Sequence, residues 1–264
     1  MLLQRIFTAL VGIPIVLVVF YYAGFFLAIA SLLAVGLGMF EFFRLAEGMG
    51  TRPLVGLGYL IGFSWILFGV YFWQGKFLPI ALLILFFVSV FLFLWKFPEN
   101  DLLDLSITFF GAFYIGGLFS YLLKIREINT EGWMFVLLVF LLTWSNDSAA
   151  FFVGSTFGKH RLCPKLSPKK SVEGFWGGVI FTTGVAVVFG YIFSGKMHIM
   201  WGLLGLLAAI VGSMGDLLES GLKRLSNAKD SGDLIPGHGG ILDRLDSLLL
   251  VAPLVYYYIQ IFSL

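Results

Sequence analysis

The residues best suited to chemistry lie in the polar segment from Gly215 to Ser247 of an otherwise apolar chain. If Gly215–Arg224 is helical, one polar face carries Asp216, Glu219, Ser220 and Lys223, because they are spaced at i, i+3, i+4 and i+7. An acid, a hydroxyl and an ammonium group on one face are suited to binding a phosphate and its counterion. This spacing therefore favours a phosphate-binding site over a loop whose charges are only solvated.

A second pair of acids follows in the same segment. Asp243 and Asp246 are three residues apart, so both carboxylates project to the same side of a helix. Their charges repel unless a cation lies between them. Mg²⁺ fits best, because one or two carboxylates hold it while water and substrate phosphates fill its other positions.

Glycines and cations separate these two acidic faces. Pro236–Gly240 contains three glycines, whose backbone N–H groups can approach a ligand closely. The neighbouring cations are Lys223, Arg224, Lys229 and Arg244. Acids for a metal, a glycine-rich turn and cations for phosphate charge together indicate phosphate transfer. The alternative is an exposed polar loop.

A further acid, Asp147, lies within the apolar run that begins at Gly132. A carboxylate at bilayer depth costs about 2.5–3.5 kcal/mol on insertion scales, so it usually faces a cavity and has a function. The alternative is that Asp147 ends its helix early.

A basic loop follows, with five cations between Lys159 and Lys170. Ser171 is placed to cap the next helix and Glu173 to lie in its first turn. Lys169 and Lys170 are suited to anionic headgroups or to a polyphosphate. The alternative is that these charges only set membrane topology.

The elements that position these residues must lie in a membrane. Of 264 residues, 59% are hydrophobic and 12% charged, with a mean hydropathy of +0.98, whereas soluble domains are about 25% charged. A soluble fold and a disordered chain are both excluded. The net charge of +2 argues against a nucleic-acid partner, and the single Cys163 excludes an intrachain disulfide.

Apolar stretches long enough to cross a bilayer predict an all-α, polytopic membrane protein of about nine helices. Ile6–Phe40 is uncharged and long enough for two short spans, broken near Tyr22–Gly24. We interpret the N-terminal MLLQRIF as part of a span and not as a removed signal peptide. The other predicted spans are Pro53–Gly75, Phe77–Trp95, Leu105–Leu123, Gly132 to about Gly154, Gly174–Gly195, Met197–Gly215 and Ser247–Leu264.

Positive charge predicts the orientation of these spans. Only four of the 17 Lys and Arg residues fall on one side, namely Lys76, Lys124, Arg126 and Lys196. The other side is therefore cytoplasmic, together with the N-terminus and the polar segments. Residues 1–131 are predicted to form a helical scaffold, and residues 132–264 to carry the catalytic site.

The polar residues of 220–246 resemble the signature of the phosphatidate cytidylyltransferases, also called CDP-diacylglycerol synthases. Trp144 with Asp147, and Ser167 through Gly174, also resemble that family. The matching signature positions are Ser220, Lys223, Arg224, Lys229, Asp230, Pro236, His238, Gly239, Gly240, Asp243, Arg244 and Asp246.

The resemblance implies that phosphatidate and CTP react to give CDP-diacylglycerol and pyrophosphate, for phospholipid biosynthesis. The lipid phosphate would attack the α-phosphorus of CTP in line, with Mg²⁺ and a second metal stabilising the attacking and leaving oxygens. It also implies a multi-pass protein of the cell inner membrane, with its active site facing the cytoplasm. A homodimer is compatible with the many small and aromatic residues.

With this resemblance, each candidate residue receives a role. The predicted metal ligands are Asp147, Asp216, Asp243 and Asp246. The predicted catalytic residues are Asp216, Lys223, Arg224, Asp243 and Asp246. The predicted substrate-binding residues are Lys169, Lys170, Ser220, Lys229, His238, Gly239, Gly240 and Arg244.

Two other functions remain open at this point. A CTP-dependent lipid kinase of the same superfamily would use similar metals and cations but transfer the γ-phosphoryl group. A transporter would use Asp147 and Asp216 as an ion path, and would require inverted repeats. The charge-poor first half argues against the transporter.

Overall fold

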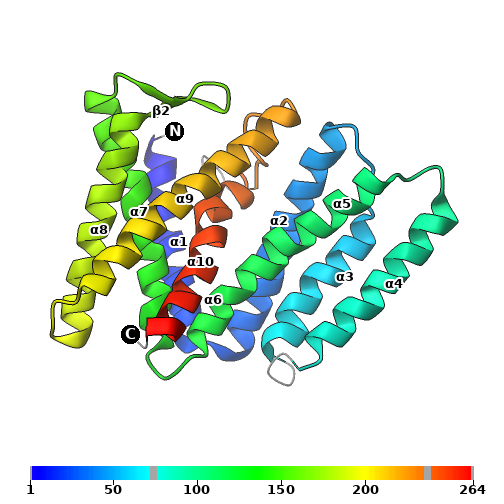
Figure 1. Ribbon diagram of the computed structural model, residues 1–264, viewed down its shortest axis with the longest axis horizontal. Helices are drawn as coiled ribbons and strands as arrows, with labels where there is room; N and C mark the ends of the chain where they lie inside the picture. Colours follow the sequence, from blue (N-terminus) through cyan, green and yellow to red (C-terminus); the bar gives the residue numbers. More distant parts are fainter. Residues whose placement is uncertain (1, 72–75, 235–238, 263–264) are drawn as a thin grey trace. The chain divides into compact units, whose positions relative to one another are not determined.

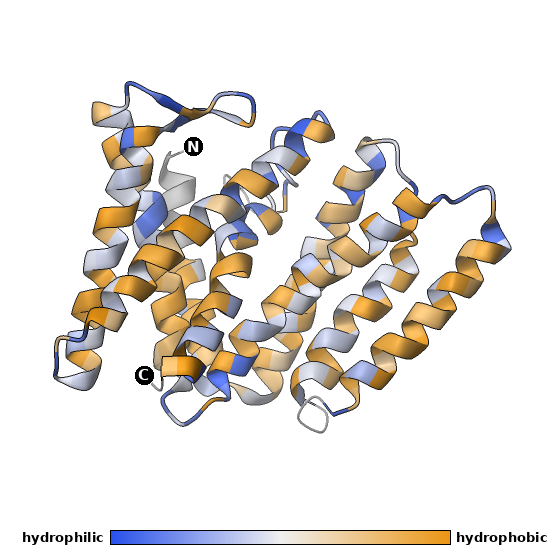
Figure 2. Ribbon diagram, in the orientation of Figure 1, coloured by the Kyte–Doolittle hydropathy of each residue, from blue (hydrophilic) through white to orange (hydrophobic). Residues whose placement is uncertain are grey.

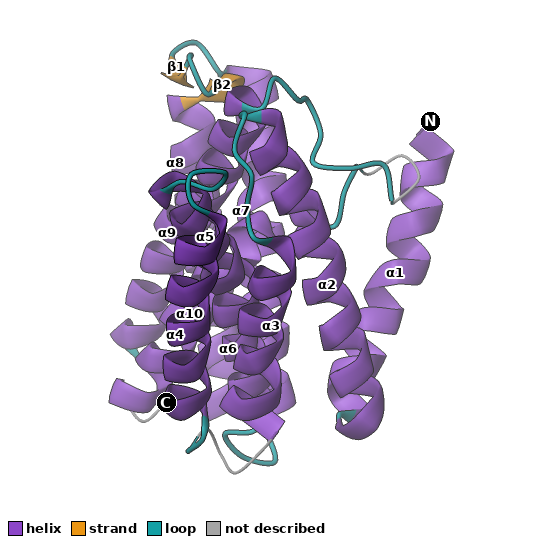
Figure 3. Ribbon diagram, turned by 90° about the vertical axis from the view of Figure 1, so that its right-hand side faces the viewer, coloured by secondary structure: helices purple, strands orange, loops and turns teal. Residues whose placement is uncertain are grey.

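The computed structural model describes residues 2–71, 76–234 and 239–262, and nearly all of its regular structure is helical (Figure 1). The prediction of an all-α polytopic protein is confirmed, apart from one short hairpin (Figure 3). The elements are α1 (Leu2–Tyr22), α2 (Gly24–Gly48), α3 (Val55–Ile66), the π-helical η1 (Leu67–Tyr71), α4 (Leu78–Lys96), α5 (Leu102–Gly111), the π-helical η3 (Ala112–Gly117), α6 (Leu118–Arg126), α7 (Gly132–Phe157), β1 (Arg161–Cys163), β2 (Ser167–Ser171), α8 (Val172–Ser194), α9 (Ile199–Leu225) and α10 (Leu242–Phe262).

The chain forms two compact units, which we describe separately. The first contains residues 1–126 and 222–243, and the second contains residues 127–221 and 244–264. The boundary at 126 lies close to the predicted one at 131, but residues 222–243 group with the first half of the chain. The assignment of catalysis to residues 132–264 remains a prediction.

Seven helices in the described part of the chain are long and apolar enough to cross a membrane. Two shorter apolar helices, Leu10–Tyr22 and Val55–Tyr71, account for the remaining predicted spans, so the count of nine stays a prediction. Figure 2 shows α4 as an almost unbroken apolar helix, in agreement with its low burial. An exposed apolar surface of this length is suited to contact with lipid.

The break between the first two spans is confirmed. Helix α1 ends at Tyr22 and α2 begins at Gly24. Ala23 and Gly24 have φ angles of 54° and 64°, and a right-handed α-helix cannot continue through residues with positive φ.

Several helices extend further than hydropathy predicts, and three of them carry candidate site residues. Helix α9 continues through the polar residues to Leu225, and α10 begins at Leu242, before its apolar stretch. Helix α7 continues to Phe157, so Asp147 is internal and the alternative that it ends its helix is wrong. Hydropathy marks the part of a helix that contacts lipid, whereas backbone hydrogen bonding continues into polar surroundings.

Within the first unit, α2 packs against α3 and α5 through aromatic rings and glycines. Phe42 and Phe43 are buried and lie edge to face, with ring centroids 5.6 Å apart. A Cβ on Gly58 or Gly111 would overlap these rings. The close approach that glycine permits therefore places the last turns of α2 inside the unit.

Within the second unit, α7 and α8 pack closely along their length. A Cβ on Gly174 would lie 2.7 Å from the Ala150 carbonyl oxygen, and one on Gly177 would lie 2.6 Å from Val153. The glycines that begin α8 therefore hold the start of that helix against the second half of α7, where Asp147 lies.

The basic loop forms an antiparallel hairpin of β1 and β2. The predicted cap is confirmed: Ser171 Oγ accepts a hydrogen bond of 3.1 Å from Gly174 N at the start of α8. Glu173 lies in the first turn as predicted. The hairpin is therefore fixed directly to the helix that follows it.

Candidate active site

A pocket of about 580 Å³ lies in the second unit, between α7, the β1–β2 hairpin, the start of α8 and α9. We call it the aspartate pocket. It brings together Asp147 and Asp216 with Lys169 and Lys170, four residues that the sequence analysis took from three separate segments. Its complete lining is Asn146, Asp147, Ala150, Phe151, Gly154, Ser155, Gly158, Arg161, Leu162, Lys169, Lys170, Ser171, Gly174, Phe175, Ser213 and Asp216.

Charges of both signs meet in this unit. Lys170 Nζ forms an ion pair with Asp216 Oδ2. Asp246 interacts electrostatically with Asp216 and Asp147, whose like charges oppose its own, and with Lys170, whose charge favours it. The positive charge of Arg244 acts on Asp147. Three acids that repel one another in this way favour a nearby cation or cationic side chain.

Close packing of α9 on α10 holds two of these acids together. A Cβ on Gly215 would lie 3.0 Å from Ser247 Cα and still closer to the Asp246 carbonyl oxygen. Only glycine fits here. Since Gly215 directly precedes Asp216, this contact sets the separation of Asp216 and Asp246.

We expect Gly215→Ala to lower the free energy of unfolding by about 1–3 kcal/mol, because its methyl group must push two backbones apart. The measurement is the thermal midpoint in detergent. Gly202→Ala on the same helix is the control, since its Cβ would meet only two side-chain methyl groups, Val187 Cγ2 at 3.4 Å and Thr183 Cγ2 at 4.0 Å. Equal midpoints for the two variants would contradict the packing argument.

Glu173 fixes the loop that leads into the hairpin. It accepts hydrogen bonds from the backbone N–H groups of Lys159 (3.0 Å) and His160 (3.2 Å), and its Oε1 lies 2.6 Å from His160 Nδ1. With Ser171, it ties both ends of the hairpin to the first turn of α8. The hairpin that carries Lys169 and Lys170 is therefore anchored at both ends.

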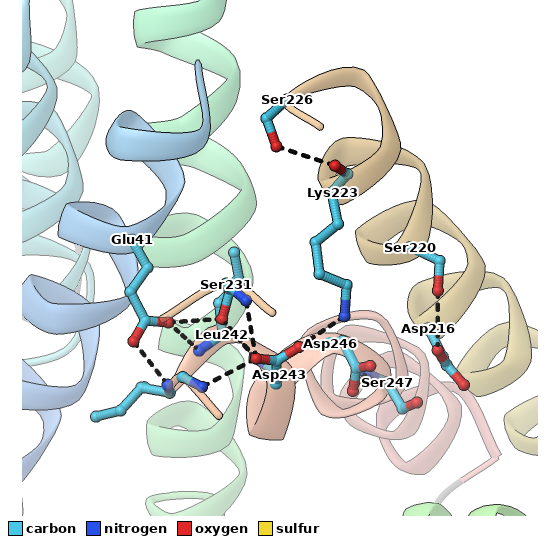
Figure 4. Close-up of polar contacts among 12 residues, drawn as sticks. Glu41, Asp216, Ser220, Lys223, Ser226, Ser231, Leu242, Asp243, Asp246 and Ser247 are labelled. Carbon is cyan, nitrogen blue, oxygen red and sulfur yellow. Dashed lines mark hydrogen bonds and ion pairs between the residues drawn. The ribbon is translucent and has the colours of Figure 1, made fainter. Parts of the chain in front are cut away.

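A separate polar cluster lies in the first unit, around Asp243 (Figure 4). Asp243 Oδ1 accepts a 2.6 Å bond from Lys223 Nζ, and both side chains are largely buried. Asp243 Oδ2 accepts from the backbone N–H groups of Ser231 (3.0 Å) and Gly240 (2.9 Å) and from Ser231 Oγ (2.9 Å). Protein donors thus occupy both oxygens of this predicted metal ligand.

This cluster also contains an acid that the sequence analysis missed. Glu41, on α2, is 1% exposed and accepts hydrogen bonds from Ser231 Oγ (2.9 Å), Ile241 N (2.9 Å) and Leu242 N (2.8 Å). It therefore caps the start of α10 from another helix. The sequence feature that could have pointed to Glu41 is its place as a single acid directly after the uncharged stretch Ile6–Phe40.

The remaining predicted site residues are distributed over both units. In the first unit Arg224 and Lys229 are exposed, and Gly239 has a φ of 82° that favours glycine. In the second unit Ser220 Oγ lies 3.5 Å from Asp216 Oδ1, one turn along α9 (Figure 4), and Arg244 is exposed. His238 lies outside the described residues.

The carboxylates of the aspartate pocket suit Mg²⁺ in chemistry but are not a preformed cage. Within the described residues, no three Asp, Glu, His or Cys side chains are grouped to hold a metal ion. Mg²⁺ needs few protein ligands, because water and substrate phosphates complete its shell. Asp147 and Asp216, which line the pocket, supply the hard oxygen atoms that it prefers, and Asp246 interacts electrostatically with both.

Comparisons with known proteins relate this chain to cytidylyltransferases. Residues 3–262 match the model of the Cytidylyltransferase family. Proteins named phosphatidate cytidylyltransferase from Bacillus subtilis (strain 168) and Staphylococcus aureus (strain COL) are each 42% identical, over 154 and 153 residues. These alignments cover 58% and 57% of this chain, and 57% and 55% of the relatives. The chain thus spans little more than half the length of the curated relatives it matches.

Proposed function

We infer the function from one premise: this chain belongs to the Cytidylyltransferase family. We propose that it transfers the cytidylyl group of CTP to phosphatidate, giving CDP-diacylglycerol and pyrophosphate for phospholipid biosynthesis. The observation that carries this proposal is the aspartate pocket, which joins two acids and two lysines from separate segments. The relatives' name, phosphatidate cytidylyltransferase, supports the choice of substrates.

In the proposed reaction, a phosphate oxygen of phosphatidate attacks the α-phosphorus of CTP. A new P–O bond forms as the bond from the α-phosphorus to the β-phosphate oxygen breaks, and pyrophosphate leaves. The attacking oxygen is already ionised, so no general base is needed. Both reactants are anions, so the chain must first neutralise charge to let them approach.

The cations of the aspartate pocket perform that neutralisation in our proposal. Lys169 and Lys170 hold the phosphates of CTP or of the lipid, while Arg161 adds a third positive charge to the pocket lining. The Lys170–Asp216 ion pair orients the lysine before substrate binds. Lys223 and Asp243, which pair in the first unit, fix the start of α10.

Mg²⁺ is part of the proposal, with Asp147, Asp216 and Asp246 as its protein ligands. When bound, it would screen the charge between nucleotide and lipid phosphates. We also propose a cytoplasmic-facing site in the cell inner membrane, on the basis of positive charge in the polar loops. Homodimerisation remains a prediction.

The decisive experiment incubates detergent-purified protein with phosphatidate and CTP labelled at either the α- or the γ-phosphorus. We expect the α-label to enter the lipid, the γ-label to leave as pyrophosphate, and both to require Mg²⁺. Entry of the γ-label into the lipid would instead show the lipid kinase. No label in lipid under any condition would contradict both reactions.

We expect Lys170→Met to lower kcat/KM for CTP roughly ten- to hundredfold, because one charge-assisted hydrogen bond contributes about 1.5–3 kcal/mol. Steady-state kinetics with varied CTP measures this loss. Lys165→Met is the matched control, since Lys165 is exposed on the turn of the same hairpin and is absent from the pocket lining. Equal losses in both variants would indicate a general charge effect.

A further inference from the structure

A second pocket, of about 460 Å³, lies in the first unit between the start of α3 and the end of α4. We call it the α3–α4 pocket. Its lining includes Arg52, Leu54, Leu57, Leu92, Lys96 and Asn100. None of these residues lines the aspartate pocket or belongs to the predicted catalytic set.

The α3–α4 pocket holds two cations, Arg52 and Lys96, that have no direct partner in the part of the chain that the structure describes. Among the described residues, no hydrogen bond or ion pair engages the Arg52 guanidinium or the Lys96 ammonium; Arg52 has only a through-space interaction with Asp104. Glu99 also lines the pocket, which leaves one net positive charge in the lining. An anion bound between the two cations would satisfy both.

The backbone beneath these cations is held rigidly. Asp104, 4% exposed, accepts hydrogen bonds from Arg52 N (2.6 Å) and Asn100 Nδ2 (3.3 Å). Asn100 Nδ2 also lies 2.9 Å from the Arg52 carbonyl oxygen. This network fixes the main chain at Arg52. The binding of a ligand therefore costs little conformational entropy of the backbone.

The rest of the pocket wall is apolar and continues onto a lipid-facing helix. Leu57 is buried, Leu92 is half-buried, and the adjoining Phe91 and Trp95 are 60% and 76% exposed. Only 11% of the α4 span is buried in the protein. Since that span ends at Lys96, the cations lie at the depth where lipid headgroups begin.

We propose that the α3–α4 pocket binds the headgroup of one anionic phospholipid. Its phosphate lies between Arg52 and Lys96, and an acyl chain follows Leu92 along the outer face of α4. Basic pockets between membrane helices are suited to such headgroups. Inorganic phosphate could satisfy the cations, but it would leave the apolar wall without a partner.

The test is native mass spectrometry of the intact, delipidated protein titrated with phosphatidylglycerol, phosphatidylcholine or inorganic phosphate. We expect one phosphatidylglycerol to bind saturably, at least about tenfold more tightly than phosphatidylcholine. The double variant Arg52→Gln/Lys96→Gln should lose at least tenfold in this affinity. Leu92→Trp, which fills the pocket without changing charge, should lose a similar factor.

The charge-matched control is Lys76→Gln/Lys196→Gln, which removes two exposed cations away from the pocket and should bind as the wild type does. Three results would overturn the proposal. These are equal affinity for the two lipids, unchanged binding in Leu92→Trp, or displacement of the lipid by equimolar phosphate, which would assign the cations to a free anion.

Discussion

Asp246→Asn is expected to reduce cytidylyl transfer by about 10²–10³-fold, the usual loss when one electrostatic group of an active site is removed. Asp246 interacts with both Asp147 and Asp216, so its charge belongs to the cluster proposed to hold Mg²⁺. Asparagine keeps the shape of the side chain, and its oxygen can still accept the 2.6 Å bond from Ser247 N. The loss therefore reports on charge and not on packing.

The same variant should be at least as heat-stable as the wild type, because removing one of three like charges relieves repulsion. A lower rate together with an unchanged or higher thermal stability distinguishes a catalytic defect from unfolding. The control is Asp233→Asn, an exposed acid outside the aspartate pocket and outside the predicted signature. A near-normal rate for Asp246→Asn at every Mg²⁺ concentration would contradict its role as a metal ligand.

Asp147, Asp216, Lys169 and Lys170 show what sequence can predict about a site. Each stood out for a local reason, such as an acid at bilayer depth or cations beside a helix cap, and the structure places all four in one pocket. Hydropathy predicted the seven helices that are long and apolar enough to cross a membrane, because transfer into lipid acts on each stretch of about 20 residues independently. The properties of short stretches of sequence were sufficient to predict these features.

Asp243 and Glu41 show where local spacing is insufficient. The three-residue spacing of Asp243 and Asp246 placed both on one helix correctly, but it carried no information about their partners. Asp243 is held by Lys223, Ser231 and Gly240. Glu41 contacts residues about 200 positions away, and a single acid among aromatic residues forms no motif. Such pairings depend on helix packing, which one sequence does not reveal.

Glu41→Ala is expected to lower the free energy of unfolding by about 2–5 kcal/mol, because each buried donor left without an acceptor costs about 1–3 kcal/mol. The affected donors are Ile241 N and Leu242 N at the start of α10, and Ser231 Oγ. The cavity left by the side chain adds to this loss. The thermal midpoint of purified protein measures it.

Glu41→Gln is the sharper variant, because it preserves volume and keeps one carbonyl oxygen. Its NH₂ group must face a backbone N–H or the Ser231 hydroxyl, so we expect a smaller loss of stability, about 1–3 kcal/mol. Ser231 Oγ also contacts Asp243 Oδ2, so the substitution should disturb Asp243 as well. We therefore expect kcat to fall about tenfold or more, with KM for CTP nearly unchanged, since Glu41 does not line the aspartate pocket.

Glu47→Gln supplies the matched control, because Glu47 lies on the same helix with an exposed side chain. It should leave both the thermal midpoint and kcat unchanged. If Glu41→Gln were as stable and as active as this control, Glu41 would have no positioning role. If it lost stability but kept full kcat at a temperature where it is folded, Glu41 would serve the fold alone. A fall in kcat in the folded variant would instead extend the proposed catalytic apparatus to α2, a helix that no sequence motif marks.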